Sequence, residues 1–307
     1  MSEAAWHPTH AVELIAGTPP GGGLDRAARA LARVVAARGL LDVPLQVRNI
    51  AGDGGRKSWL HIDACPGDPH VICISSPNLT TDHLLGTTPG DYSRYTPLAI
   101  LYTEYIAFAV RTDSPLGTGA DVLRRLGQAP DGLSIALATS LGNPNHVALA
   151  RIARHAGADP RALRIRVFDS ALDAVADVIA GGAELAAVTA ASTAAELASG
   201  RVRLIGMSSP ARLPAPFADA PTWQEQGVTC VVDSWRGANG PAGLPAAARQ
   251  FWEGVLSAAT GAQEWRAELA AHGWSPMYLD GPALLAHLAR ERDEMRAALV
   301  ALGLIGG

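Results

Sequence analysis

Short apolar runs alternate along the chain with longer segments in which apolar residues recur every three or four positions. Runs of four to six apolar residues are typical of buried strands, and the wider spacing is typical of helices with one buried face. Strands that alternate with helices favour a parallel sheet covered by helices, so the pattern predicts an α/β fold. The predicted strands are residues 12–15, 45–48, 71–75, 98–101, 106–111, 133–138, 165–168, 185–188 and 202–207.

The clearest helix signal follows three consecutive glycines, Gly21 to Gly23. Apolar residues between Leu24 and Val35 fall on one face of this segment, and arginines fall on the other. Gly39 is predicted to end the helix, because glycine readily adopts the left-handed conformation found just after many helices. A glycine-rich loop between a strand and a helix is therefore predicted near the start of the chain.

The order of strand, polar loop and helix occurs twice more. In the second instance Asn143 is the predicted helix cap and Pro144 the first helical residue. The third helix follows the strand that ends at 168 and is predicted to end before Gly181. Its predicted buried face consists of Ala171, Leu172, Val175, Val178 and Ile179.

The last part of the chain changes character after the turn at 240–245. Long amphipathic helices are predicted there, with Trp252, Trp265 and Leu288 on their apolar faces. No low-complexity linker separates two halves, and we expect the chain to cross between two lobes near residues 105 and 230. The predicted lobes are 1–105 together with 231–307, and 106–230.

Composition narrows the class of protein. The 307 residues are 48% hydrophobic, which is enough for one large α/β domain or two lobes with real cores. The net charge is -4 and no basic block is present, so no nucleic-acid partner is predicted. The chain contains no uncharged run of about 18 apolar residues, so no membrane span is predicted.

Cysteine usage and the N-terminus leave the compartment open. Cys65, Cys73 and Cys230 form no C-x-x-C pair, so the fold is not expected to depend on disulfides. The opening residues MSEAAWHPTH lack a basic start followed by an apolar stretch, so we expect no secretory signal in the chain as given. Either the protein is cytosolic or a leader has been removed.

The glycine loop is suited to binding an anion, because helix N-termini carry free N–H groups and a positive dipole end. A phosphate-binding P-loop would need a lysine after the glycines, and none is present. The dinucleotide fingerprint fails because Arg26 stands where its third glycine should be. A turn that only starts a helix remains an alternative, but two comparable loops favour a shared ligand.

Six segments together resemble one protein family. They are TPPGGGLDRAARALA, VRNIAGDGGRKS, LATSLGNPNHVALARI, the stretch from IAGGAELAAVTA to IGMSSPAR, APTWQEQGV and SWRGANGPAGLP. In this order and spacing they are similar to the solute-binding proteins of tripartite tricarboxylate transporters, also called Bug proteins. The resemblance covers almost the whole chain.

This resemblance implies two Rossmann-like lobes in the flytrap arrangement of type II periplasmic binding proteins. Such a protein is no enzyme and needs no cofactor. It captures a small organic carboxylate between its lobes and delivers it to the permease subunits of a membrane transporter. The implied location is the periplasm, and a cytosolic carboxylate sensor is the alternative if no leader exists.

In the family, backbone amides of two glycine-rich loops grip one carboxylate of the ligand. The resemblance places the matching positions in the first loop, in the loop after the third strand and in the second glycine-rich loop, with two more beside them. These predicted ligand-binding residues are Thr18, Gly21, Gly22, Asp25, Ser75, Ser76, Asn78, Thr139, Ser140, Gly142, Asn143, Asn145, His146, Asp169 and Thr189.

Three departures from the family pattern lie near the expected ligand. Asp169 stands where Lys is common, Val188 stands where Asp is common before Thr189, and Arg236 stands where an aromatic residue usually follows the tryptophan. Asp169 and Glu104 could accept a hydroxyl or amino group, and Arg236 could pair with a second carboxylate. Solvation or pairing within the protein is the alternative for each of these charges.

An α/β serine hydrolase is the best enzyme alternative. Residues 138–142 come within one position of the G-x-S-x-G elbow, with Ser140 as the nucleophile. The acid and base could be Asp219 or Asp233 followed by His272 or His287. Against this, Asn143 and Pro144 delay the helix that should supply the oxyanion hole.

No metal site is predicted. His7 and His10 lie near the N-terminus, and His61 lies near Asp63, but neither pair has a third ligand at a fixed interval. His146 begins a helix and could donate to an anion, or it could only cap and pack the helix.

Overall fold

The computed structural model describes residues 6–306 and divides the chain into two compact units. Unit 1 contains residues up to 103, 235–271 and 275–295, and unit 2 contains residues 104–234, 272–274 and those from 296 on. Each unit is an α/β structure with its own core. The predicted α/β class is therefore confirmed.

Unit 1 is built on a parallel set of three strands in the order β2-β1-β3: β1 (Val12–Ala16), β2 (Leu45–Asn49) and β3 (Val71–Ser75). Strand β9 (Asp233–Gly240) is antiparallel to β3 and lies next to β4 (Thr96–Arg111). Strand β10 (Ser275–Leu279) pairs with the first part of β4. The loops after β1 and β3 therefore leave the same edge of the sheet.

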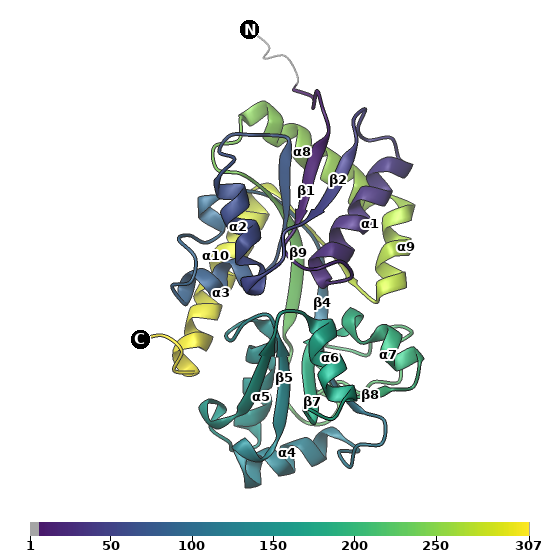
Figure 1. Ribbon diagram of the computed structural model, residues 1–307, viewed down its shortest axis with the longest axis vertical. Coiled ribbons are helices and arrows are strands. Elements are labelled where there is room, and N and C mark those ends of the chain that lie inside the picture. Colours follow the sequence, from purple (N-terminus) through teal and green to yellow (C-terminus); the bar gives the residue numbers. More distant parts are fainter. Residues whose placement is uncertain (1–5, 307) are drawn as a thin grey trace. The chain divides into compact units, whose positions relative to one another are not determined.

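Helices flank these strands (Figure 1). Figure 1 shows α1 and α9 on one side of β1 and β2, and α2, α3 and α10 on the other. A core of Trp59, Trp235, Leu284 and neighbouring apolar residues fills the second side. The helices with residues in unit 1 are α1 (Gly23–Ala37), α2 (Arg56–Asp63), α3 (Asn78–Leu84), α8 (Ala246–Gly261), α9 (Gln263–His272) and α10 (Gly281–Ala301).

Unit 2 repeats the parallel arrangement with β7 (Leu185–Thr189), β5 (Ser134–Ala138) and β6 (Arg164–Phe168) in that order. The second part of β4 runs antiparallel to both β7 and β8 (Val202–Met207). The helices are α4 (Gly119–Gln128), α5 (Pro144–His155), α6 (Ala171–Ile179) and α7 (Ala194–Ala198). Short 3₁₀ turns cover Asp53–Gly55, Tyr92–Arg94, Pro130–Gly132, Pro160–Ala162 and Ala190–Ser192.

The predicted strands all exist, but two predictions about them were wrong. Residues 98–101 and 106–111 belong to the single strand β4, because its central polar pair, Thr103 and Glu104, is buried within the strand. Strands β9 and β10 were not predicted. Two glycines and an asparagine in β9 are typical of a turn, so the sequence pattern did not predict a strand there. Gly237 is needed in β9, because a Cβ atom at this position would lie 2.6 Å from the carbonyl oxygen of Ala99.

The predicted helix boundaries agree with the structure. Gly39 has a left-handed φ of 58° just after α1, and Asn143 and Pro144 begin α5 as expected. One predicted face was wrong: Leu172 of α6 is exposed, whereas Ala174 is buried. Ala171, Ala174, Val175 and Val178 form one helix face at three- and four-residue spacing, and Leu172 falls at its border.

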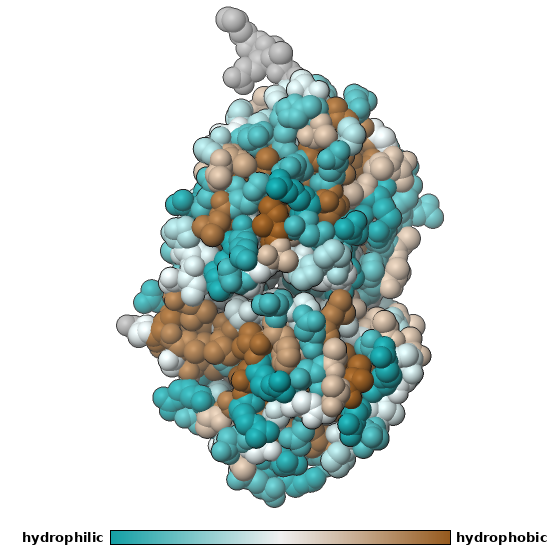
Figure 2. All heavy atoms as spheres, viewed as in Figure 1, coloured by the Kyte–Doolittle hydropathy of each residue, from teal (hydrophilic) through white to brown (hydrophobic). Residues whose placement is uncertain are grey.

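The surface combines polar and apolar areas. On the face shown in Figure 2, hydrophobic residues gather near the C-terminal end of the chain, and hydrophilic residues cover much of the rest. None of the helices in residues 6–306 has both the length and the apolar character that a membrane crossing requires.

Candidate functional site

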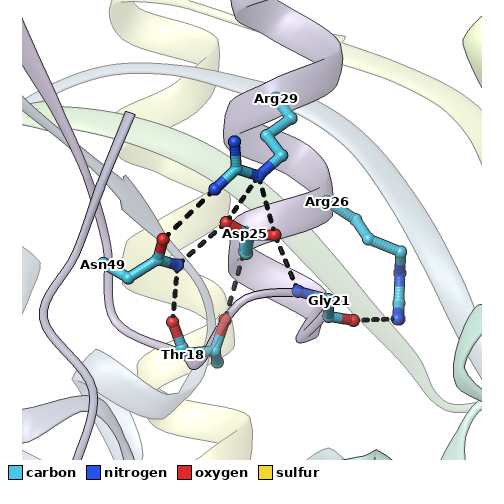
Figure 3. Close-up of polar contacts among 6 residues, drawn as sticks. All are labelled: Thr18, Gly21, Asp25, Arg26, Arg29 and Asn49. Carbon is cyan, nitrogen blue, oxygen red and sulfur yellow. Dashed lines mark hydrogen bonds and ion pairs between the residues drawn. The ribbon is translucent and has the colours of Figure 1, made fainter. Parts of the chain in front are cut away.

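The first glycine loop joins β1 to α1 in unit 1 (Figure 3). Its shape depends on Asp25 in the first turn of the helix. The Gly21 N–H donates to Asp25 Oδ2 at 2.8 Å, and the Asp25 N–H donates to Thr18 Oγ1 at 3.1 Å. Gly22 has no room for a side chain, because a Cβ atom there would lie 2.6 Å from Thr18. The loop is therefore closed on itself by its own polar groups.

Asp25 is only 1% exposed, so its carboxylate must be compensated within the protein. Arg29 Nε donates to both oxygens at 2.9 and 3.0 Å, and Asn49 Nδ2 donates to Oδ1 at 2.8 Å. Burial alone would raise the pKa of Asp25, but hydrogen bonds from Arg29, Gly21 and Asn49 outweigh it and lower the pKa below its ordinary value. Asp25 is thus a charged anchor of the loop.

The N-terminus of α1 keeps free donors. Among the described residues, no hydrogen-bond acceptor faces the N–H groups of Gly23 and Leu24. These groups lie at the positive end of a helix of 15 residues, which favours an anion. The loop is thus shaped by Thr18, Gly21 and Gly22. The N–H groups left free at the start of α1 are those of Gly23 and Leu24.

Two further segments of unit 1 reach the same sheet edge. Ser75 ends β3, pairs with Gly237 of β9 and donates through Oγ to Asn239 Oδ1 at 3.3 Å. Ser75 and Ser76 are buried, and Asn78 begins α3 in a partly exposed position. Since β1 and β3 are parallel neighbours, the predicted residues of these two loops are brought together.

The sequence analysis left one residue of this edge out of its predicted site. Arg236 precedes Gly237 on β9 and is only 6% exposed. Its Nη1 donates to the carbonyl oxygen of Trp235 at 2.9 Å, and Trp235 Nε1 donates to Glu291 at 2.7 Å. A Cβ atom on Gly23 would lie 3.3 Å from Nη2 of Arg236. The sequence analysis noted Arg236 only as a departure from the family pattern that could pair with a second carboxylate, and it did not predict the strand in which Arg236 lies.

The second glycine loop joins β5 to α5 in unit 2 and is organised by neutral groups. Asn143 Oδ1 accepts from the His146 N–H at 3.2 Å. Asn143 Nδ2 donates to the Ala138 oxygen at 2.7 Å and to Thr139 Oγ1 at 2.9 Å. Thr139 has a positive φ of 68°, which is strained for a β-branched residue, and Gly142 has a φ of 84°. Asn143 holds the strained turn in place.

His146 is also part of this network. The Gly142 N–H donates to His146 Nδ1 at 2.9 Å, which assigns the ring proton to Nε2. Burial lowers the pKa of His146 to about 4, so the ring is neutral at pH 7. The Nδ1 lone pair of this uncharged imidazole already accepts from the chain. His146 can therefore offer a ligand only its Nε2–H donor.

Two polar side chains near the start of α5 have unused capacity. Ser140 Oγ and Asn145 Oδ1 are buried, and neither has a hydrogen-bond partner within residues 6–306. Asn145 is 6% exposed as a whole residue and lies in the first turn of α5. Buried polar atoms without partners are costly, so their presence in a glycine loop is typical of a binding site.

The remaining predicted residues of unit 2 lie at the ends of neighbouring strands. Thr189 ends β7, is buried and places its Oγ1 3.1 Å from Ser192 Oγ. Asp169 follows β6 and is exposed. Because β7, β5 and β6 are parallel neighbours, both residues leave the same sheet edge as the second loop. Solvation thus accounts for Asp169, whereas Glu104 and Arg236 are buried.

The serine hydrolase alternative finds little support at Ser140. No histidine lies within hydrogen-bonding distance of its Oγ among the described residues. The nearby His146 accepts from Gly142 instead, and α5 begins four residues after Ser140. Within the described part of the chain, no cluster of three histidine, cysteine or acidic residues is suited to a metal.

Comparisons with known proteins bear on the whole chain. A family model described as the tripartite tricarboxylate transporter family receptor matches residues 28–304. A curated protein from Pseudomonas sp. (strain P51), described as the UPF0065 protein in the tcbD-tcbE intergenic region, is 27% identical over 242 residues. That alignment covers 78% of this chain and 70% of the Pseudomonas protein.

Solved structures show the same fold over nearly the entire chain. R. palustris Rpa4515 with adipate has 20% identity and a TM-score of 0.88, covering 96% of this chain and 98% of that one. The periplasmic binding protein BugD has 20% identity and a TM-score of 0.85, covering 97% and 99%. MatC (Rpa3494) from Rhodopseudomonas palustris with bound malate has 19% identity and a TM-score of 0.82, covering 95% and 99%. The predicted solute-binding-protein fold is therefore confirmed.

Proposed function

We propose a function from one premise: the chain belongs to the tripartite tricarboxylate transporter receptor family. Its role is to capture a small organic carboxylate and deliver it to the membrane permease of such a transporter. Two structural relatives were solved with dicarboxylates, adipate and malate, and this supports a carboxylate ligand here. The expected location is the periplasm, where the similar protein BugD is described.

The observation that carries this proposal is the pair of glycine loops, one in each unit. Each loop connects a parallel strand to a helix of at least 12 residues and keeps buried or N-terminal polar groups without protein partners. Amide N–H groups at two helix ends can together bind a carboxylate. The predicted lobes, 1–105 with 231–307 and 106–230, and a ligand held between them, are part of the proposal.

A ligand screen tests the proposal. The full chain is heated with single carboxylates from a panel of C4 to C8 mono-, di- and hydroxycarboxylates, and hits are measured by calorimetry. A ligand at a hundredfold excess over its Kd should stabilise the protein by about 2.7 kcal/mol. The corresponding alcohols and diamides, which lack the negative charge, are the controls. If none of the acids raises the melting temperature, the proposed function is wrong.

Absence of catalysis is the second part of the proposal. It is supported by Ser140 Oγ, which has no hydrogen-bond partner among residues 6–306 that could act as its general base. We expect no hydrolysis of p-nitrophenyl acetate or butyrate above the background rate. Ester turnover that disappears in Ser140→Ala would instead favour the hydrolase alternative.

A further inference from the structure

Four dipeptides of the chain carry the same latent backbone chemistry. They are the Asp-Gly pairs at 53–54, 131–132 and 280–281 and the Asn-Gly pair at 239–240. In each pair the backbone nitrogen of the glycine can attack the side-chain carbonyl carbon, because glycine has no Cβ atom to hinder the approach. In an unfolded chain the Asn-Gly pair reacts first, since an amide loses ammonia more readily than a carboxyl group loses water. The fold changes this order.

The Asn-Gly pair is held within the sheet of unit 1. Asn239 lies in β9, is 5% exposed and is paired in register with Cys73 of β3. Ser75 Oγ donates to its Oδ1 at 3.3 Å. Attack by the Gly240 nitrogen would turn Asn239 out of a paired, buried strand, and such strands open only at a large cost in free energy. The folded protein therefore opposes the reaction at this pair.

Two of the Asp-Gly pairs are restrained by hydrogen bonds. The Gly132 N–H donates to the Ala129 oxygen at 3.0 Å, so the nitrogen that would attack Asp131 is already engaged. The Asp280 carboxylate accepts from the Tyr278 hydroxyl at 3.1 Å. Each of these bonds must break before the glycine nitrogen can reach the carboxyl carbon, and this adds to the barrier.

Asp53 has none of these restraints. It is exposed at the turn between β2 and α2, and its carboxylate makes no hydrogen bond or ion pair within residues 6–306. The Gly54 N–H also has no acceptor in the described part of the chain. Glycines on both sides let the backbone of Asp53 reorient. Asp53 itself has a left-handed φ of 51°, a conformation that costs energy for a residue with a Cβ atom.

We propose that Asp53-Gly54 is a site of spontaneous isoaspartate formation in the folded protein. The Gly54 nitrogen bonds to Cγ of the protonated carboxyl group, and the hydroxyl leaves with the amide proton as water. A second water then opens the five-membered ring. Cleavage between the nitrogen and Cγ restores Asp53. Cleavage between the nitrogen and the backbone carbonyl carbon leaves a chain that runs through Cβ and Cγ and a free α-carboxylate, with no change in mass.

The turn that would be altered packs against the first glycine loop of unit 1. Ser58 Oγ donates to the Gly55 oxygen at 2.6 Å, and a Cβ atom on Gly17 would lie 2.6 Å from the same Oγ. A Cβ atom on Gly55 would lie 3.5 Å from the Gly17 oxygen. Isoaspartate adds one methylene group to the backbone of this turn, so the modification acts next to the segment that leads from β1 into the loop. It does not depend on the proposed function.

Ageing the full chain at neutral pH tests the proposal, with one sample folded in buffer and one unfolded in urea. Trypsin cleaves after Arg48 and Arg56 and releases the peptide 49–56, and the other three pairs fall in the separate peptides 126–151, 237–249 and 267–290. Isoaspartate is identified in each peptide by fragmentation in the mass spectrometer. An isoaspartyl methyltransferase, which methylates the free α-carboxylate, gives a second readout.

In the folded sample we expect peptide 49–56 to form isoaspartate at least about fivefold faster than each of the other three, the effect of one hydrogen bond that need not break. In urea we expect peptide 237–249 to react first. Asp53→Asn should speed the reaction at this position. Asp53→Glu should remove it, because the ring would need six members, and should leave the other three peptides unchanged.

The parent chain alone can overturn the proposal, so the test does not depend on how well a variant folds. Folded protein whose peptide 49–56 stays free of isoaspartate would contradict it, whatever happens in urea. The same order of reaction in the folded and unfolded samples would also contradict it, because the fold would then not favour Asp53.

Discussion

The two glycine loops have the same topology, a parallel strand followed by a helix, yet they are held together by different chemistry. In unit 1 a buried ionised carboxylate, Asp25, ties the loop to Arg29 and Asn49 (Figure 3). In unit 2 a neutral amide, Asn143, and a neutral imidazole, His146, serve the same purpose. The comparison teaches that one loop geometry can be stabilised with or without charge, and the two solutions should respond differently to pH.

The largest expected difference is the pH dependence of the unit 2 loop. The pKa of His146 is lowered to about 4 in the folded state from 6.5, so the unfolded chain binds the proton first as pH falls. Stability is therefore lost between pH 6.5 and pH 4, by about 3 kcal/mol at 1.36 kcal/mol per unit. Urea unfolding followed by circular dichroism at pH 7, 5.5 and 4.5 measures it.

The control for this prediction is His146→Gln, which cannot titrate but can still accept from Gly142. We expect a flatter pH profile between pH 7 and 4.5 in this variant, even if its stability at pH 7 is lower. Parallel profiles for the parent and His146→Gln would mean that His146 is not the titrating group.

The stabilising contribution of Asp25 in unit 1 should be lost at a lower pH than that of His146. The pKa of Asp25 is lowered in the folded state, so its contribution is complete above the ordinary value of 3.8 and is lost as pH falls below it. At pH 7, Asp25→Asn should cost about 2 kcal/mol, because Arg29 and the Gly21 N–H lose an ionised acceptor. The difference between parent and variant in urea unfolding should shrink toward pH 3.

Asp159→Asn is the matched control for Asp25. Asp159 also has a lowered pKa, but it is exposed and pairs with Arg161 at the surface. Its substitution should change stability little at any pH, because water screens the pair. An equal loss for the two variants would contradict the role of Asp25 as a buried anchor.

A smaller effect is expected from the neutral cap of unit 2. Asn143→Ala removes the side chain that accepts from His146 and donates to Ala138 and Thr139, and we expect a loss of about 1.5 kcal/mol. Asn143→Asp keeps the acceptor at the helix end but not the two donated hydrogen bonds, so it should recover only part of the lost stability. Hydrogen exchange of the first-turn amides of α5 reports the effect locally.

The smallest effect is expected at the exposed face of α1. Arg33 pairs with Glu268 at 2.7 Å, but the arginine side chain is largely open to solvent. Arg33→Gln should cost less than about 1 kcal/mol in urea unfolding, and that cost should fall as salt is added. A loss as large as that of Asp25→Asn would show that burial is not what separates the two ion pairs.

Local rules predicted much of the fold and part of the candidate site. The end of α1 at Gly39 and the start of α5 at Asn143 and Pro144 follow from preferences that act within one turn of helix. The family resemblance, now confirmed over residues 28–304, came from six motifs along the chain, two of which contain the glycine loops. The ligand-binding role of the individual residues stays a prediction.

Other features depended on neighbours that are distant in sequence. Strand β9 was not predicted because its glycines are typical of a turn, yet one of them, Gly237, is required by the close approach of β4. Asp25 looked like a ligand-binding residue, and the structure shows its carboxylate bonded to Asn49, which lies 24 positions away.

The sequence by itself determined the alternation of strands and helices, the two glycine loops and the family, because these depend on the order of residues and on preferences within a few positions. The tertiary structure decided which charges are buried and what they touch. Arg236 and Asp25 are charged residues of ordinary appearance in the sequence, and both are almost completely buried in unit 1. Burial and hydrogen bonding govern the energy of a charge, and both come from segments that only folding brings together.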